Sequence, residues 1–255
     1  MLKVMTVVGT RPEVIKLSRI IPSFDNFFDH RLIHTNQNYD YELNKIFFDE
    51  LKIRQPNVFL DTASTSASRT ISNVISQVDE QIKEFKPDAF FILGDTNSCL
   101  SAISAKRNKI PIFHFEAGNR CFDFRVPEEI NRKIVDHVSD INITYSQIAK
   151  DYLLKEGFPA DQIICAGSPM KEILSYYEKN INSSKILKKI DLEFSSFFLI
   201  SMHREETVDD KEKLSEIFKT LTELKEIYKK RIIISCHPRT KNRLKEFKIE
   251  TDNDL

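Results

Sequence analysis

Carboxylates follow two short apolar runs of the sequence, where each run would leave a sheet. The run that starts at Phe113 reaches Glu116, and the run that starts at Phe90 reaches Asp95. After the first of these, Glu128 lies in the opening turn of an expected helix. A carboxylate at the end of a buried strand has a perturbed pKa, which general acid/base catalysis near neutral pH requires. Asp95, Glu116 and Glu128 are therefore candidate proton-transfer groups.

Each of these acids also fits a structural role. Asp95 is placed to cap the helix that follows it, and Glu116 is placed to pair with a nearby arginine. One of Glu128 and Glu129 is expected to do no more than complement its helix dipole. Both sets of roles stay open. A metal site is disfavoured, because the sequence has no H-x-x-x-H motif and no dense aspartate spacing.

The turn at residues 9–13 reads Gly-Thr-Arg-Pro-Glu and follows the first apolar run. Its threonine and glutamate have capping-box spacing, and its proline suits a first helical turn. Free N–H groups at the helix start, with Arg11 and Lys16, suit a phosphate or diphosphate. A merely well-capped helix is an equal alternative. The turn matches neither the dinucleotide-binding G-x-G-x-x-G motif nor a P-loop.

Two later apolar runs each end in a histidine followed within two residues by an arginine. The first reads Met-His-Arg at residues 202–204, and the second reads Cys-His-Pro-Arg at residues 236–239. A lone histidine is more often packed than reactive, but the repetition favours a role for His203, Arg204 and His237. The histidines at positions 30, 34 and 114 lack this context and are expected to be structural, and His137 is expected to be structural or supporting.

The composition fits a globular protein with no strong field for nucleic acid or membranes. Lys+Arg and Asp+Glu both number 38 in 255 residues, a length that favours two lobes. No apolar run reaches about 18 residues. The four cysteines show no C-x-x-C spacing, which argues against a zinc knuckle or a disulfide framework and indicates a reducing cytoplasm.

Short apolar runs alternate with amphipathic segments, which predicts parallel sheets with helices on both faces. The expected strands are 2–8, 31–35, 89–93, 110–115, 141–145, 163–166, 197–201 and 232–235. The expected helices are 11–21, 41–51, 67–85, 98–106, 128–138, 146–156, 171–180 and 210–228. We expect an N-terminal Rossmann-like lobe at residues 1–170, a linker region at 171–196 and a second lobe at 197–255.

The chain resembles the non-hydrolysing UDP-N-acetylglucosamine 2-epimerase family from residue 3 to the region of residue 240. Several linked motifs carry the resemblance in order: Gly9-Thr10-Arg11-Pro12-Glu13, Gly94-Asp95-Thr96, Glu116-Ala117-Gly118, Pro127-Glu128-Glu129-x-Asn131-Arg132, His203-Arg204 and His237-Pro238. It implies an α/β, glycosyltransferase-B-like fold with two Rossmann-like lobes. The second lobe would be incomplete here, because the family continues well past residue 255 with the segment that holds uridine and diphosphate.

The resemblance implies an isomerase that inverts C2 of a UDP-2-acetamido sugar, without metal or other cofactor, in making surface polysaccharides such as lipopolysaccharide or capsule. A base would remove the C2 proton as UDP departs, and UDP would add back to the resulting glycal. The resemblance implies catalytic roles for Asp95, Glu116, Glu128 and His203. It implies substrate or UDP binding by Arg11, Lys16, Arg120, Arg204 and His237. Family members are typically homodimers, and neither nucleic acid nor a membrane is an expected partner.

The loop at residues 119–127 and the segment 34–41 resemble a narrower branch. That branch acts on UDP-2-acetamido-2,6-dideoxy-L-hexoses, for L-N-acetylfucosamine or L-N-acetylquinovosamine. Asn36 stands where the family usually has glycine, which predicts a strained turn, and Thr207 stands where asparagine is usual. Two alternatives to an epimerase stay open: a truncated, inactive or weakly binding fragment of such an enzyme, and a UDP-sugar glycosyltransferase of similar fold.

Overall fold

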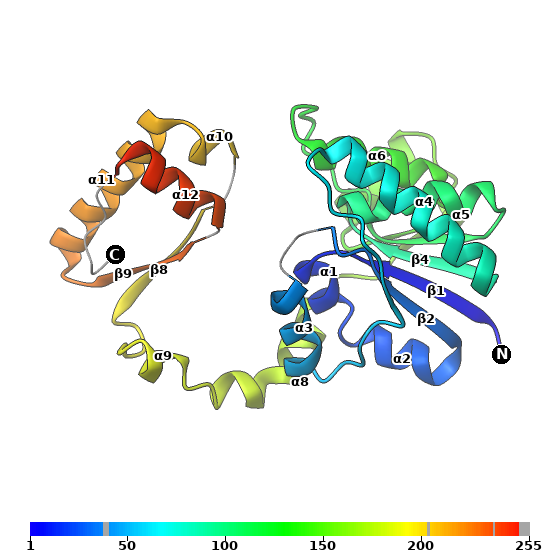
Figure 1. Ribbon diagram of the computed structural model, residues 1–255, viewed down its shortest axis with the longest axis horizontal. Helices are drawn as coiled ribbons and strands as arrows, with labels where there is room; N and C mark the ends of the chain where they lie inside the picture. Colours follow the sequence, from blue (N-terminus) through cyan, green and yellow to red (C-terminus); the bar gives the residue numbers. More distant parts are fainter. Residues whose placement is uncertain (38–40, 203–204, 237, 250–255) are drawn as a thin grey trace. The chain divides into compact units, whose positions relative to one another are not determined.

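The structure is a computed structural model that describes residues 1–37, 41–202, 205–236 and 238–249. The chain divides into two compact units, Met1–Glu178 and Lys179–Leu255 (Figure 1). The lobe limits expected from the sequence, at residues 170 and 197, stay a prediction. Helices α8 (Met170–Asn182) and α9 (Ile186–Lys189) occupy much of the segment expected to link the lobes.

The first unit contains a parallel sheet of seven strands in the order β3-β2-β1-β4-β5-β6-β7. The strands are β1 (Lys3–Val8), β2 (Asp29–His34), β3 (Val58–Phe59), β4 (Ala89–Leu93), β5 (Ile112–Ala117), β6 (Ile141–Thr144) and β7 (Ile163–Cys165). In the register of the two central strands, Leu93 of β4 pairs with Phe115 of β5. Asp95 and Glu116 therefore emerge from neighbouring strands at the same edge of the sheet.

Helices cover both faces of this sheet, as the apolar patterns predict (Figure 1). One core joins the strands to α4 (Ala67–Phe85), α5 (Ala102–Arg107) and α6 (Pro127–Val138). The other joins them to α1 (Arg11–Lys16), α2 (Ile20–Phe27) and α3 (Tyr41–Glu50). A 3₁₀ turn, η1 (Asn97–Ser101), leads into α5, while α7 (Gln147–Lys155) and η2 (Ala160–Gln162) precede β7.

The prediction of a single helix at residues 11–21 is wrong, because the structure has two helices there, α1 and α2. Pro22 explains the break. In one continuous helix its ring would clash with the carbonyl four residues earlier, and its missing N–H would cost a hydrogen bond. In the structure it lies in the first turn of α2, where no N–H is needed. Leu17, at the end of α1, and Ile21, on α2, are both fully buried in the second core.

The second unit has a parallel pair of strands, β8 (Phe197–Met202) and β9 (Arg231–Cys236), in the part of the chain that the structure describes. Its helices are α10 (Glu205–Val208), α11 (Lys211–Tyr228) and α12 (Pro238–Phe247). Leu214, Phe218 and Leu221 recur at helical spacing along α11 and are buried, as is Ile232 of β9. An amphipathic helix therefore packs on the strand pair.

Candidate active site

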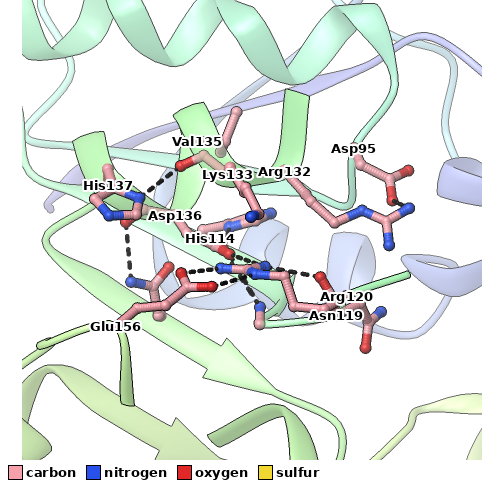
Figure 2. A network of polar contacts seen from close by, with 12 residues as sticks. Asp95, His114, Asn119, Arg120, Arg132, Lys133, Val135, Asp136, His137 and Glu156 are labelled. Atoms are coloured by element: carbon pink, nitrogen blue, oxygen red, sulfur yellow. Dashed lines mark hydrogen bonds and ion pairs between the residues drawn. The ribbon is translucent and has the colours of Figure 1, made fainter. Parts of the chain in front are cut away.

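Asp95 stands one residue after Gly94, which continues β4 with a left-handed φ of 73°. Its carboxylate lies 2.8 Å from Nη2 of Arg132 on α6 (Figure 2). Burial raises the pKa of Asp95, and the nearby Glu116 and Glu128 raise it further, while Arg132 opposes the shift. Asp95 is therefore a carboxyl group that takes up a proton more readily than an exposed aspartate.

Glu116 has a left-handed backbone, with φ at 70°, where the pairing of β5 with β6 shifts register. A non-glycine residue at this φ is uncommon, and such strain concentrates at functional sites. The carboxylate pairs with Nζ of Lys16, and both side chains are three-quarters buried or more, at 18% and 25% exposed. Burial, with Glu116 close by, raises the pKa of the Tyr145 hydroxyl. Glu116 therefore leaves the sheet from a strained backbone and faces Lys16.

The two acids that open α6 differ in their surroundings. Glu129 is buried, and its carboxylate accepts N–H groups of Cys121 at 3.0 Å and Phe122 at 3.3 Å. Burial acts to raise the pKa of Glu129, but those hydrogen bonds and Arg132 lower it. Glu128 is exposed and pairs with no cation among the described residues, yet its charge acts on Asp95. The expectation that one acid of the pair is structural fits Glu129.

The turn at residues 9–13 is closed by its own glutamate. Oε2 of Glu13 accepts the N–H groups of Gly9 at 2.5 Å and Thr10 at 2.7 Å, and Oε1 accepts the Thr96 hydroxyl at 2.6 Å. Burial raises the pKa of Glu13 against these hydrogen bonds. These bonds form the capping box that the spacing of Thr10 and Glu13 predicts. Phosphate binding at the start of α1 stays a prediction.

The two bases predicted beside the turn lie in different surroundings. Arg11 is exposed, and its guanidinium lies 5.5 Å from the ring centre of Phe47. Lys16 points to Glu116 and so belongs with the acid/base cluster. That either residue binds UDP stays a prediction.

Arg120 enters a buried ion network instead of standing open to solvent (Figure 2). Its Nε and Nη2 donate to both oxygens of Glu156 at 2.8 and 2.6 Å, and its Nη1 donates to Asp136 at 2.7 Å. Burial acts to lower the pKa of Arg120, but the two carboxylates raise it. The side chain has no exposed surface. These contacts favour a structural role, and substrate binding by Arg120 stays a prediction.

Sequence analysis missed Asp136 and treated His114 as merely structural. Both side chains are fully buried, and Nδ1 of His114 lies 2.9 Å from Oδ1 of Asp136. The signal was a polar residue inside an apolar strand, which must find a buried partner. The predicted residues of the second unit, His203, Arg204 and His237, lie outside the residues that the structure describes.

Comparison with known proteins identifies the family of the chain. A family profile described as UDP-N-acetylglucosamine 2-epimerase matches residues 23–253. The chain belongs to the UDP-N-acetylglucosamine 2-epimerase family. Its members are UDP-sugar 2-epimerases, isomerases that act on carbohydrate derivatives. Family membership, predicted from the linked motifs, is confirmed.

Two curated members of the epimerase family illustrate the similarity in sequence. A UDP-N-acetylglucosamine 2-epimerase of Methanocaldococcus jannaschii is 39% identical over 254 residues, which cover 97% of this chain and 69% of the relative. A UDP-2,3-diacetamido-2,3-dideoxy-D-glucuronate 2-epimerase of Pseudomonas aeruginosa is 33% identical, covering 94% of this chain and 68% of the relative. The family thus includes more than one UDP-sugar substrate.

Solved structures of the epimerase family agree in fold. A UDP-N-acetylglucosamine 2-epimerase from Rickettsia bellii is 53% identical with a TM-score of 0.90, covering 97% of this chain and 66% of that one. The M. jannaschii enzyme in complex with UDP-GlcNAc and UDP is 37% identical with a TM-score of 0.89, covering 97% and 69%. The predicted glycosyltransferase-B-like α/β class is confirmed. The chain spans 66–69% of the length of these relatives.

Two further expectations bear on surroundings and substrate. No helix in the described part of the chain is long and apolar enough to cross a membrane. The narrower branch acting on 6-deoxy-L-sugars stays a prediction, since neither curated relative described above is named for such a sugar. Asn36, expected to strain its turn, does have a left-handed φ of 52°. Asparagine tolerates this region better than most residues, which makes the replacement of glycine feasible.

Proposed function

We propose that this chain is a UDP-sugar C2-epimerase that removes the C2 proton of a UDP-2-acetamido sugar as UDP departs. The observation that carries the proposal is the pair of carboxylates, Asp95 and Glu116, at the ends of adjacent parallel strands. Glu116 acts on Asp95 through space and raises its pKa. Inversion at C2 removes a proton from one face of the carbon and returns one to the other face. This requires two acid/base groups close to the same carbon.

The chemistry balances without a redox partner. The C2–H bond breaks as the proton passes to a carboxylate, its electron pair forms the C1–C2 double bond, and the C1–O bond pair leaves with UDP. UDP then adds back to C1, while C2 takes a proton on the opposite face. Because no carbon skeleton is oxidised or reduced overall, neither a nicotinamide nor a metal is part of the proposal.

The environments of the acids support different roles. Asp95 has a raised pKa, so it is suited to hold a proton and deliver it. Glu116 pairs with the Lys16 ammonium, and we assign it the role of proton acceptor. Glu128 at the helix start is a third candidate, and His203 is proposed to stabilise charge on the departing phosphate. UDP binding by Arg11, Lys16, Arg204 and His237 belongs to the same proposal.

Location, assembly and biological use are also proposed. The absence of C-x-x-C spacing and the position of Cys99 as a buried free thiol are compatible with a reducing cytoplasm. A homodimer and a place in surface polysaccharide synthesis follow from the family resemblance. The substrate is proposed as a UDP-2-acetamido sugar, with the 6-deoxy-L-sugars as a narrower possibility.

Incubation of the protein with UDP-GlcNAc in D2O tests the proposed reaction. An epimerase places one deuterium at C2 and produces the C2 epimer, both visible by proton NMR. A glycosyltransferase would release UDP and leave the C2 hydrogen in place. Unchanged UDP-GlcNAc and unchanged UDP-2-acetamido-6-deoxy-L-sugars, at protein concentrations comparable with substrate, would contradict the proposal.

A further inference from the structure

The carboxylate of Asp136 joins three segments that carry or flank the proposed proton-transfer groups. It accepts the N–H of Gly118, two residues past Glu116, at 3.3 Å to each oxygen. It also binds Nη1 of Arg120 at 2.7 Å and lies 2.9 Å from Nδ1 of His114 (Figure 2). Asp136 therefore holds the end of β5 and the loop after it against α6.

His114 extends this connection to the neighbouring strand. Its Nε2 lies 2.8 Å from the carbonyl oxygen of Gly94, the residue directly before Asp95. One buried chain of contacts thus runs from α6 through Asp136 and His114 to the end of β4. The same helix carries Arg132, which binds Asp95 directly. The positions of both proposed carboxylates depend on one face of α6.

Both ring nitrogens of His114 face acceptor groups. The Gly94 carbonyl can only accept, so Nε2 carries a hydrogen. Asp136 receives hydrogen bonds from Arg120 and Gly118 and is an ionised carboxylate that can also only accept. Nδ1 of His114 lies 2.9 Å from this carboxylate. The ring is therefore held between the Asp136 carboxylate and the Gly94 carbonyl.

We propose that Asp136, with His114 and Arg120, is a positioning centre that sets the separation of the Asp95 and Glu116 carboxylates. None of the three needs to touch the substrate. Arg120 is anchored at its far side by Glu156, which closes a network of one guanidinium, one imidazole ring and two carboxylates. Buried ionic groups of this kind fix one arrangement of the segments that they join, and a displaced catalytic group loses rate steeply.

His114 also acts on Asp95 electrostatically. The charged groups that bear on Asp95 are Arg132 and Glu128 from α6, and Glu116 and His114 from β5. Of these, His114 lowers the pKa of Asp95 against the effect of burial. Replacing His114 with neutral glutamine should therefore raise the pKa of Asp95.

A second cluster of the same composition supplies a matched control. His30 Nδ1 lies 2.6 Å from Oδ1 of Asp25, and Arg54 Nε donates to Oδ2 at 2.9 Å. His30 is the second residue of β2, so this cluster lies at the amino ends of the parallel strands. Asp25→Asn thus removes the same kind of carboxylate from the same kind of partners, away from the proposed site.

The rate test compares C2 deuterium exchange for Asp136→Asn, His114→Gln and Asp25→Asn. The first two are expected to lower kcat by about 10–100-fold with KM changed less than about threefold, as for other residues that orient catalytic groups. Asp25→Asn should stay within about twofold of the unmodified protein. A folded Asp136→Asn that keeps its full kcat, or an equal loss in Asp25→Asn, would overturn the proposal. If Asp136→Asn does not fold, Arg120→Lys replaces it in the comparison.

The rate test rests on the proposed reaction. A second measurement, the titration of Asp95, does not depend on that reaction. The carboxyl ¹³C signal of Asp95, assigned by its loss in Asp95→Asn, is titrated in unliganded protein. The titration midpoint should move to higher pH in His114→Gln and stay unchanged in Asp25→Asn. An unchanged midpoint in His114→Gln overturns the positioning centre. Absence of exchange by the unmodified protein, with the midpoint shifted, would instead refute the epimerase reaction alone.

Discussion

Gly118 directly follows β5, two residues after Glu116, and has no room for a side chain. Its φ is 78°, and a Cβ atom there would lie 2.5 Å from the carbonyl oxygen of Ala149 and 3.1 Å from Cγ of Leu153, both on α7. Gly157 has a φ of 93° but nothing within 4 Å of the same position. The pair separates the effect of backbone conformation from the effect of a steric clash.

The magnitudes follow from those two terms. An alanine in the left-handed region costs about 1–2 kcal/mol, offset by about 0.4–1 kcal/mol from restricting the unfolded chain. Gly157→Ala should therefore lower the free energy of unfolding by about 1 kcal/mol. Gly118→Ala adds the overpacking of α7, about 1–3 kcal/mol. For a unit of this size that difference corresponds to about 2–12 °C in Tm.

The assay is urea and thermal unfolding followed by far-UV circular dichroism, with both variants measured beside the unmodified protein. Gly118→Ala should unfold at clearly lower urea concentration than Gly157→Ala, with an unchanged slope. Equal losses in the two variants would refute the claim that α7 packs against the Gly118 backbone. They would show that the left-handed φ alone decides the need for glycine.

Three further predictions concern a turn, an ion pair and a strained backbone position. Glu13→Ala leaves the N–H groups of Gly9 and Thr10 without their acceptor and should cost about 2–4 kcal/mol in urea unfolding. Glu13→Gln, whose oxygen can still accept them, should cost at most about 1 kcal/mol. The Arg120 hydrogen bonds lower the pKa of Glu156 below 4.5, so its contribution is present above about pH 4.5 and is lost as the pH falls. Glu156→Gln should therefore lower stability by about 1–2 kcal/mol at pH 7 and by much less near pH 3; an equal loss at both pH values would contradict this. Asn36→Gly should leave the urea midpoint nearly unchanged, and Asn36→Val should lower stability by about 1–2 kcal/mol because a β-branched residue resists a positive φ.

Elements governed by local signals were predictable from the sequence. Helix α4 has the predicted bounds, 67–85, because Ser66 caps its start and the residue before Pro87 cannot continue it. The apolar residues of α4 recur at helical spacing and are buried. By contrast, β3 was missed, because two residues at a sheet edge carry too short a pattern to recognise.

The proposed site also has residues that the sequence identified and contacts that it could not identify. Asp95 and Glu116 were identified because parallel strands deliver their carboxyl ends to one edge. The left-handed backbone of Glu116 and the partners of Arg120 were not predictable, because they depend on pairing with β6 and on residues 16 and 36 positions further along the chain. For such contacts the sequence provides only a buried polar residue in search of a partner, as at His114.

The most direct test of the proposed site measures C2 deuterium incorporation from D2O into UDP-GlcNAc by the unmodified protein, Glu116→Gln and Asp79→Asn. Asp79 is a surface carboxylate of α4 paired with Lys83, so it controls for loss of charge alone. The unmodified protein and Asp79→Asn should exchange at equal rates, with Glu116→Gln slower by about 10²–10⁴-fold. A folded Glu116→Gln that exchanges C2 as fast as Asp79→Asn would contradict proton transfer by Glu116.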